Sequence, residues 1–393
     1  MLKTHDCGEL RLSDNGSSVA LAGWLQRRRD HGGLIFLDLR DRSGIVQVTA
    51  DPGVEEAYSV AEKARNEYVI HVKGKVRPRP DGMVNRKMAT GEIEVLASSI
   101  EIINAARAVP IPIDDDGYRT EEATRLKYRY LDLRRSRLQR NIILRHKTIK
   151  FIRDYLDARG FLEIETPMLI KSTPEGARDY VVPSRVQPGK FFALPQSPQQ
   201  LKQLLMVAGY EKYFQIARCM RDEDLRGDRQ PEFTQLDLEM SFVERDDILE
   251  VVEGLITGLI PAVTPGKRIF SPFPRMSCAE AMARYGTDKP DLRFGMEIAD
   301  ITEAVRATGA GYIAEAIAAG RAVKCIVAPG CASYSRKETD MLAASAREAG
   351  AANCATLAWT ADGMKGSIAR QLKTEEIAAI SAITGAGQGD LAC

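Results

Sequence analysis

The sequence predicts an α+β protein of several domains: a small β-barrel, a larger domain built on an antiparallel hairpin, and a smaller α/β domain. Three observations support this fold class. Five short segments of alternating apolar and polar residues fill the first hundred positions, and a basic helical stretch then leads to two further strands. From about residue 306 the composition shifts to alanine and glycine with its own α/β pattern. A chain of 393 residues is expected to form two or three domains.

Composition excludes several classes of protein. Lys and Arg total 55 against 54 acidic residues, so the net charge of +1 gives no global field for nucleic acid. The seven cysteines are scattered, with no CxxC pair and no histidine at ligand spacing, which indicates reduced thiols rather than a disulfide framework or zinc site. No apolar run approaches the ~20 residues of a membrane span, and the N-terminus lacks a signal core. We expect a cytoplasmic protein without membrane contact.

Residues 1–106 are predicted to form the barrel. Five strands and one helix are typical of the OB-fold, which binds single-stranded nucleic acid on one face. The expected strands are residues 19–26, 34–41, 44–50, 68–76 and 92–103, with a helix at 54–65.

Cationic and aromatic residues on the first three strands mark a candidate binding face. Arg27, Arg28 and Arg29 leave the first strand, and Phe36 and Gln47 lie on the next two. Guanidinium groups and an aromatic ring both stack on splayed bases, and the positive charge follows phosphate. A lone phenylalanine on a strand is more often part of the core, so the residues alone leave Phe36 open.

A proline-containing, acidic stretch at 107–120 is a predicted linker. A long helix is expected to follow and to end at Gly160. Between Arg125 and Arg153 there are eleven Lys or Arg against one acid, Asp132, a local balance of +10. Such an excess favours a polyanion partner somewhat over an ordinary solvated face.

The stretch 213–242 is predicted to form two strands joined by a charged loop. Leu236, Leu238, Met240 and Phe242 alternate with polar residues, so one face is expected to pack and the other to carry charge. At the end of the first strand, Arg221 is followed at once by three acids, Asp222, Glu223 and Asp224. A solvated hairpin is the alternative, but this order suits a polyphosphate and its metal ion better.

Four segments together resemble one known family. RDEDLRGDRQPEFTQLD (221–237) resembles motif 2 of the class II aminoacyl-tRNA synthetases, in the form found in bacterial aspartyl-tRNA synthetases. The helix before FLEIETPML (161–169) and that strand resemble motif 1, which builds the family's dimer interface. GWLQRRRDHGGLIFLDLRDRSGIVQV (23–48) is similar to the anticodon-binding barrel. The resemblance implies a catalytic domain at 121–305 and, at 306–393, an inserted α/β domain of the GAD type.

The resemblance implies ATP-dependent attachment of L-aspartate to tRNA(Asp), by way of an aspartyl-adenylate, in a homodimer. Arg221 would be the catalytic residue and would bridge the substrate carboxylate and the α-phosphate of ATP. The aspartate pocket would use Glu175, Ser197, Gln199, Lys202, Arg221 and Asp237, with Lys202 on the side-chain carboxylate. The ATP site would use Arg221, Asp222, Glu223, Arg229 and Gln230. The anticodon would contact Arg27, Arg29, Phe36 and Gln47.

The family's third motif, with an ATP-binding arginine and acidic metal ligands, has no counterpart among these residues. We therefore expect the Mg²⁺ ligands mainly outside this sequence, and we expect residues 1–393 alone to form adenylate weakly or not at all. Two alternatives stay open. One is an asparaginyl or lysyl synthetase of the same subclass. The other is a non-catalytic tRNA-binding protein that keeps the barrel and half of a catalytic domain.

Two further positions bear on which tRNA is charged. His31 and Gly82 resemble the residues found in the relaxed enzymes of the family, which aspartylate tRNA(Asn) as well as tRNA(Asp). A glycine removes a side chain that would contact the third anticodon base, and a histidine can stack on either base. His31 beside Gly32 and Gly33 is also explained as an ordinary turn residue, and the residues alone do not decide between the two.

Overall fold

The computed structural model describes residues 1–173, 175–293 and 295–393. The chain forms two compact units, Met1–Ile269 and Phe270–Cys393. Among the described residues, no helix is long and apolar enough to cross a membrane. The domain limits expected at residues 106, 120 and 305 stay predictions.

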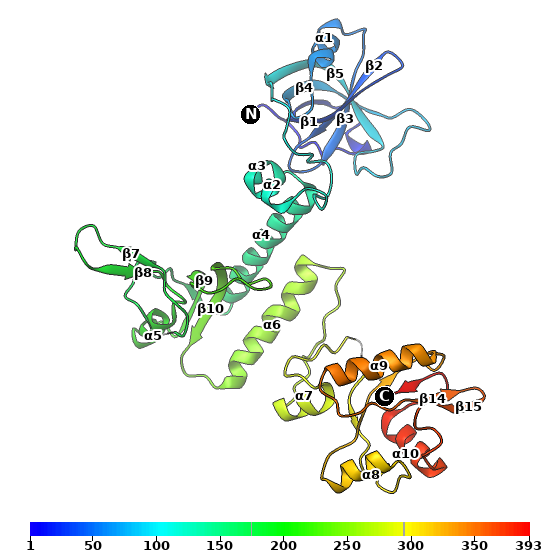
Figure 1. Cartoon of the computed structure of the whole chain (residues 1–393). Helices are drawn as coiled ribbons and strands as arrows, with labels where there is room; N and C mark the ends of the chain where they lie inside the picture. The colour runs from blue at the N-terminus through cyan, green and yellow to red at the C-terminus, as the bar shows by residue number, and fades with distance from the viewer. Residues whose placement is uncertain (174, 294) are drawn as a thin grey trace. The chain divides into compact units, whose positions relative to one another are not determined.

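A closed barrel forms the start of the first unit (Figure 1). Its strand order is β1-β2-β3-β5-β4, and all five predicted strands and the helix are present, so the OB-fold prediction is confirmed. The elements are β1 (Ser18–His31), β2 (Leu34–Arg40), β3 (Ile45–Ala50), α1 (Glu55–Lys63), β4 (Val69–Pro78) and β5 (Ile93–Asn104), after a short 3₁₀ turn η1 (Leu12–Asp14).

Strand β1 runs five residues beyond its predicted end at residue 26. A β-bulge between Leu25 and Arg27 shifts its register with β2 and lets pairing continue to His31. Gly32 and Gly33 both have positive φ, 61° and 78°, which is the conformation that a two-residue hairpin turn requires. The arginines of β1 therefore lie in the extended part of the β1–β2 hairpin, beyond the bulge.

The predicted single helix after the linker is wrong at its start. Three helices replace it: α2 (Glu122–Lys127), α3 (Arg129–Asp132) and α4 (Ser136–Asp157). Arg135 is extended, with φ −62° and ψ 133°, and therefore separates α3 from α4. The linker packs beside them, because Ile111 and Ile113 are buried against Leu131.

The second sheet of this unit has the order β10-β9-β6, formed by β6 (Leu162–Glu163), β9 (Lys212–Met220) and β10 (Glu232–Met240). β9 and β10 pair antiparallel, with Ile216 opposite Leu236, and β6 pairs parallel to β9. Helices α4 and α6 (Arg245–Val263) cover its apolar face through Leu156 and Leu255. The remaining elements are β7 (Val181–Pro183), β8 (Phe191–Ala193) and α5 (Gln199–Val207).

Two details of the expected strands are wrong. The strand expected over 161–169 pairs only at Leu162–Glu163. β10 ends at Met240, so Phe242 does not join the packed face; it has a φ of 59° and is 94% exposed. The left-handed backbone at Phe242 ends the alternation that the sequence pattern extends through this position.

The second unit is a small α/β body of its own. Its main sheet has the order β13-β16-β14-β15, and Val305, Leu357 and Ile380 belong to its core. The glycine-rich segment at 385–390 is explained by Gly385, which ends α10 in the left-handed conformation. The elements are α7 (Cys278–Tyr285), β11 (Ala299–Asp300), α8 (Gly311–Ala318), β12 (Lys324–Cys325), β13 (Val327–Ala328), α9 (Arg336–Glu348), β14 (Leu357–Thr360), β15 (Gly363–Lys365), α10 (Thr374–Thr384) and β16 (Leu391–Ala392).

Candidate functional site

The polar face of the β9–β10 hairpin holds a buried cluster of charges. α5 places Lys202 against this face, where its Nζ donates to Asp237 Oδ1 at 2.9 Å and lies 3.3 Å from Glu239 Oε2. The side chains of Lys202 and Asp237 are both 10% exposed. Asp237 and Glu239 are two residues apart on β10, so the pleat directs both toward the same cation.

Asp237 is only half satisfied by this contact. Its second oxygen, Oδ2, is buried and receives no hydrogen bond from any described residue. Burial raises the pKa of Asp237, and the contact with Lys202 opposes that rise. A buried carboxylate oxygen without a donor is costly, so the cluster is poised to accept a hydrogen bond from a ligand.

Arg221 follows the end of β9 and has the opposite deficiency. Its backbone N–H donates to Pro231 O at 2.8 Å, which holds the base of the motif 2 loop, and its guanidinium lies 5.1 Å from the centre of the Phe233 ring. The Nε atom is buried and has no acceptor among the described side chains and backbone groups. The hairpin thus buries one unmet acceptor and one unmet donor.

Cys219 lies on β9, two residues before Arg221. Burial raises the pKa of its thiol to about 11, the negative charges of Asp237 and Glu175 add to the rise, and Arg221 opposes it. Its Sγ donates to Gln235 Oε1 at 3.3 Å. The charges of Arg221, Asp237 and Glu175 thus all act on one buried thiol.

Glu175, in the loop before β7, and the segment between β8 and α5 contribute the third side of the site. Ser197 Oγ donates to Glu175 Oε2 at 2.6 Å and accepts from the backbone N–H of Gln199 at 3.2 Å. Gln196, which the sequence reasoning missed, is 1% exposed and donates from Nε2 to Ala177 O at 2.9 Å. The only signal for Gln196 is its place beside Ser197.

A cavity of about 370 Å³ opens under the motif 2 loop. Four of the five predicted ATP-binding residues line it. Asp222 is not among the lining residues; its backbone N–H donates to Arg178 O at 3.0 Å. The lining residues are Arg221, Glu223, Asp224, Leu225, Asp228, Arg229, Gln230, Pro231 and Phe233.

The described residues do not fit a metal site by themselves. No group of three or more His, Cys, Asp or Glu among them could hold an ion. The acids of the motif 2 loop, Asp222, Glu223 and Asp224, are exposed.

On the barrel, all four predicted anticodon residues lie on the adjacent strands β1, β2 and β3. Arg29 pairs opposite Phe36, and its Nη2 lies 3.3 Å from Gln47 Oε1. Arg27 pairs opposite Asp38 two residues earlier, so it lies on the same face as Arg29 and is exposed. Phe36 is half-buried rather than a core residue.

The sequence reasoning missed the acid that organises this face. Glu94 on β5 is 2% exposed and accepts from Gln47 Nε2 and Thr49 Oγ1, both at 2.8 Å, and from Arg77 Nε at 2.8 Å. Glu94 sits in an alternating strand, and only the pairing of β5 with β4 opposes it to Arg77. It orients Gln47 so that the amide oxygen faces Arg29.

The two discrimination residues lie at turns of the barrel. His31 ends β1 and is exposed at the β1–β2 turn. Gly82 lies between β4 and β5 in a turn closed by Met83 N to Pro80 O at 3.0 Å, with φ 79°. A positive φ at the third residue of such a turn favours glycine, and a Cβ there would meet open space.

Comparisons with known proteins agree with this architecture. Residues 121–374 match the model of tRNA synthetases class II (D, K and N), and residues 19–103 match the OB-fold nucleic acid binding domain. The chain is 56% identical to the aspartate--tRNA(Asp/Asn) ligase of Moorella thermoacetica and 54% identical to that of Heliobacterium modesticaldum. Each alignment covers 99% of this chain and 64% of the relative, so the chain spans about two thirds of the relatives' length.

A solved structure has the same fold. The asparaginyl-tRNA synthetase of Pyrococcus horikoshii, complexed with asparaginyl-adenylate, superposes with a TM-score of 0.60 at 27% identity. The match covers 67% of this chain and 59% of that one. With its barrel, its motif 2 hairpin and these matches, the chain belongs to the class II tRNA synthetases of the D, K and N group.

Proposed function

We propose that the whole protein attaches L-aspartate to tRNA(Asp), and also to tRNA(Asn), through an aspartyl-adenylate made with ATP. One observation carries the proposal: the motif 2 hairpin buries an unmet acceptor, Asp237 Oδ2, and an unmet donor, Arg221 Nε. An amino acid brings an ammonium group and a carboxylate, which satisfy both deficiencies at once. The names of the relatives support aspartate as that amino acid.

Selection of the side chain depends on Lys202. A second carboxylate on the substrate would join the cation that Asp237 and Glu239 already share. A lysine substrate would bring a like charge against Lys202, and asparagine would bring only a neutral amide. The site therefore favours aspartate over the other two amino acids of this subclass.

ATP would occupy the cavity under the motif 2 loop, where Arg229 and Gln230 join Arg221. The substrate carboxylate oxygen forms a bond to the α-phosphorus as the bond to pyrophosphate breaks. Arg221 neutralises charge on the reacting phosphate and aligns the carboxylate, and Glu223 with Gln230 addresses the adenosine. Such a displacement needs no protein nucleophile, so positioning and charge carry the catalysis.

The barrel would bind the anticodon through Arg27, Arg29, Phe36 and Gln47. Phe36 and the arginines offer stacking surfaces, and Glu94 holds Gln47 in place. Gly82 and His31 favour relaxed reading of the third base, which fits relatives named for both tRNAs. After adenylate formation, the aspartyl group passes to the terminal ribose of the tRNA.

We also propose a homodimer in the cytoplasm. Four apolar side chains near motif 1 are exposed, and association of two copies would cover them. They are Ile142, Ile143, Leu144 and Leu162. Light scattering at micromolar concentration tests this; a monomer at all concentrations would contradict it.

The proposed activity is tested by amino-acid-dependent exchange of pyrophosphate with ATP. The protein is a chimaera in which residues 1–393 precede the matching C-terminal segment of the Moorella relative. Aspartate should support exchange, while asparagine and lysine should support less than about a hundredth of that rate. Exchange driven best by asparagine or lysine would assign the chain to those neighbours. Binding of tRNA without any exchange would favour a non-catalytic role.

A further inference from the structure

Two buried carboxylates lie outside the candidate site, where the barrel meets the helices. The first is Glu67, which is 4% exposed and precedes β4 with a φ of 64°. Arg40 of the barrel donates from Nη2 to both oxygens at 3.0 Å. Arg134, from the residues between α3 and α4, donates from Nη1 to Oε2 at 2.6 Å, and its guanidinium lies 5.1 Å from the Trp24 ring. Glu67 therefore binds one arginine of the barrel and one arginine of the helical segment.

The second carboxylate is Asp132, which is fully buried. It accepts from Arg125 Nε at 3.1 Å, Arg129 Nη1 at 3.0 Å and Arg135 Nε at 2.8 Å. Arg135 is also fully buried and forms an ion pair with Asp115 of the linker. Asp132 thus links α2, α3 and the start of α4, and Arg135 extends the network to the linker.

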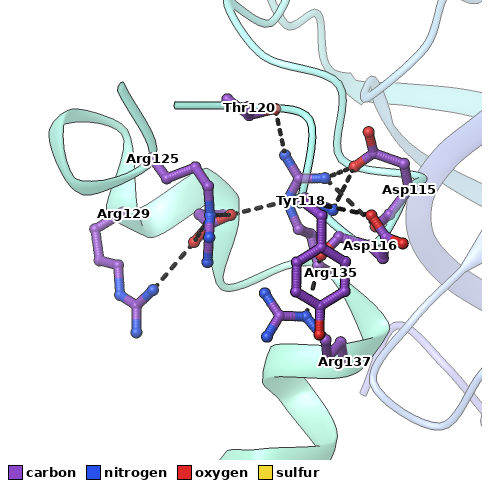
Figure 2. A network of polar contacts seen from close by, with 10 residues as sticks. Asp115, Asp116, Tyr118, Thr120, Arg125, Arg129, Arg135 and Arg137 are labelled. Carbon is purple, nitrogen blue, oxygen red and sulfur yellow. Dashed lines mark hydrogen bonds and ion pairs between the residues drawn. The ribbon is translucent and has the colours of Figure 1, made fainter. Parts of the chain in front are cut away.

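The linker closes over this network instead of leaving it exposed. Gly117 has a φ of 82°, and a Cβ at this position would lie 2.9 Å from Arg135 Nε. Arg137 donates from Nε to Asp116 O at 3.0 Å and lies over the Tyr118 ring (Figure 2). Glycine is needed at 117 both for the backbone and for the close approach.

The adjacent residues Arg134 and Arg135 therefore bind two different parts of the chain. Arg134 binds the barrel through Glu67, and Arg135 binds the linker through Asp115. The extended conformation of Arg135, which separates α3 from α4, is what lets neighbouring side chains reach opposite ways. All four carboxylate oxygens of Glu67 and Asp132 receive arginine donors.

We propose that Arg134 is a positioning residue that fixes the anticodon-binding barrel relative to the catalytic hairpin. The inference rests on the proposed function, in which one tRNA contacts both parts. Once the tRNA has bound the barrel, a fixed joint holds the catalytic hairpin close to the same tRNA, so the effective concentration for the second contact is high. A loose linker lowers that effective concentration. Arg134 acts on tRNA through its contacts with Glu67 and Trp24 of the barrel and touches no reacting atom.

The test compares three variants of residues 1–393: Arg134→Gln, its conservative counterpart Arg134→Lys, and Arg140→Gln. Arg140 is an exposed arginine of α4 without a polar partner among the described residues, so its variant matches the loss of charge alone. Two affinities are measured for each protein, for a whole tRNA(Asp) transcript and for its anticodon stem-loop. The rate of tryptic cleavage at Arg107 and Arg119 reports linker opening without tRNA.

Arg134→Gln should weaken whole-tRNA binding by about tenfold and leave stem-loop binding unchanged. Its linker should be cut several-fold faster, Arg134→Lys should restore part of both effects, and Arg140→Gln should resemble the wild type in cleavage and in the ratio of the two affinities. Equal loss for tRNA and stem-loop, or no change in either, would overturn the proposal. If no variant binds tRNA, the proposed function fails, while the cleavage rates still decide whether Arg134 holds the joint; unchanged cleavage rejects it.

Discussion

Two buried ionic networks in the first unit differ in how completely they are paired. At the joint, both oxygens of Glu67 and of Asp132 receive arginine donors. At the candidate site, Asp237 has one oxygen bound to Lys202 and one that receives no hydrogen bond from the described residues. Glu67, Asp132 and Asp237 are all buried, so the difference lies in pairing rather than in burial.

The difference separates a structural role from a binding role. A buried charge without a partner is unfavourable, and a protein keeps one where a ligand completes the network. A fully paired network has no unpaired donor or acceptor for a ligand, and removing one of its members destabilises the fold. We therefore expect variants at the joint to lose stability and variants at the site to lose ligand affinity.

The largest effect on stability is expected for Asp132→Asn. The change leaves Arg135 buried with a weakened partner, so the free energy of unfolding should fall by about 3–5 kcal/mol. Asp154→Asn is the matched control, because Asp154 forms only an exposed pair with Lys150 and should change stability by less than about 0.5 kcal/mol. Urea denaturation measures both; equal effects would contradict the contrast.

Arg221→Ala should instead act on catalysis. It removes the group proposed to contact substrate and phosphate, so kcat of exchange in the chimaera should fall by about 10²–10³, more than KM rises. The free energy of unfolding should stay within about 1 kcal/mol of the wild type, since Arg221 Nε has no partner to lose. A variant with near-normal kcat would remove Arg221 from the mechanism.

Asp237→Asn tests the site through pH. Burial raises the pKa of Asp237 above its ordinary value of 3.8. Between pH 3.8 and the raised pKa, Asp237 is therefore protonated in the folded protein and ionised in the unfolded chain. Wild-type stability therefore falls as pH rises from 3.8 through the raised pKa, and the asparagine variant avoids this loss. The stability of the variant minus that of the wild type should increase over this range. A flat or decreasing difference in urea denaturation would show that Asp237 is already satisfied.

The smallest effect is expected at His31. Wild-type residues 1–393 should bind the anticodon stem-loops of tRNA(Asp) and tRNA(Asn) within about tenfold of each other, ~1.4 kcal/mol. His31→Leu should widen that ratio in favour of tRNA(Asp), because leucine offers neither a hydrogen bond nor a stacking ring. Wild-type discrimination above tenfold would reject relaxed specificity.

Much of the fold could be predicted from alternation and motifs, because both depend on neighbours in sequence. The barrel strands and the packed face of β9–β10 follow from period two. The joint could not be predicted, since the same basic stretch is compatible with a polyanion partner. Its charges are largely internal: six of the eleven Lys and Arg have acidic partners, namely Arg125, Arg129, Arg134, Arg135, Lys150 and Arg153.

The sequence proposes residues for the candidate site but not their geometry. The family resemblance indicates Arg221, Lys202 and Asp237, and the packing of α5 on β10 shows that the last two bind each other. No local pattern marks Glu94 and Gln196, because each acts through a hydrogen bond to a distant segment. Long-range pairing is not encoded in local spacing.

The most direct test titrates a non-hydrolysable aspartyl-adenylate analogue into residues 1–393 by calorimetry. Wild type and Arg134→Gln should bind the analogue with the same affinity, because the joint lies outside the candidate site and has no unpaired group to bind the ligand. Arg221→Ala should bind about a hundredfold more weakly, because it lacks the donor that the ligand satisfies. Equal binding by wild type and Arg221→Ala, or equal loss in both variants, would contradict the division between the paired joint and the unpaired site.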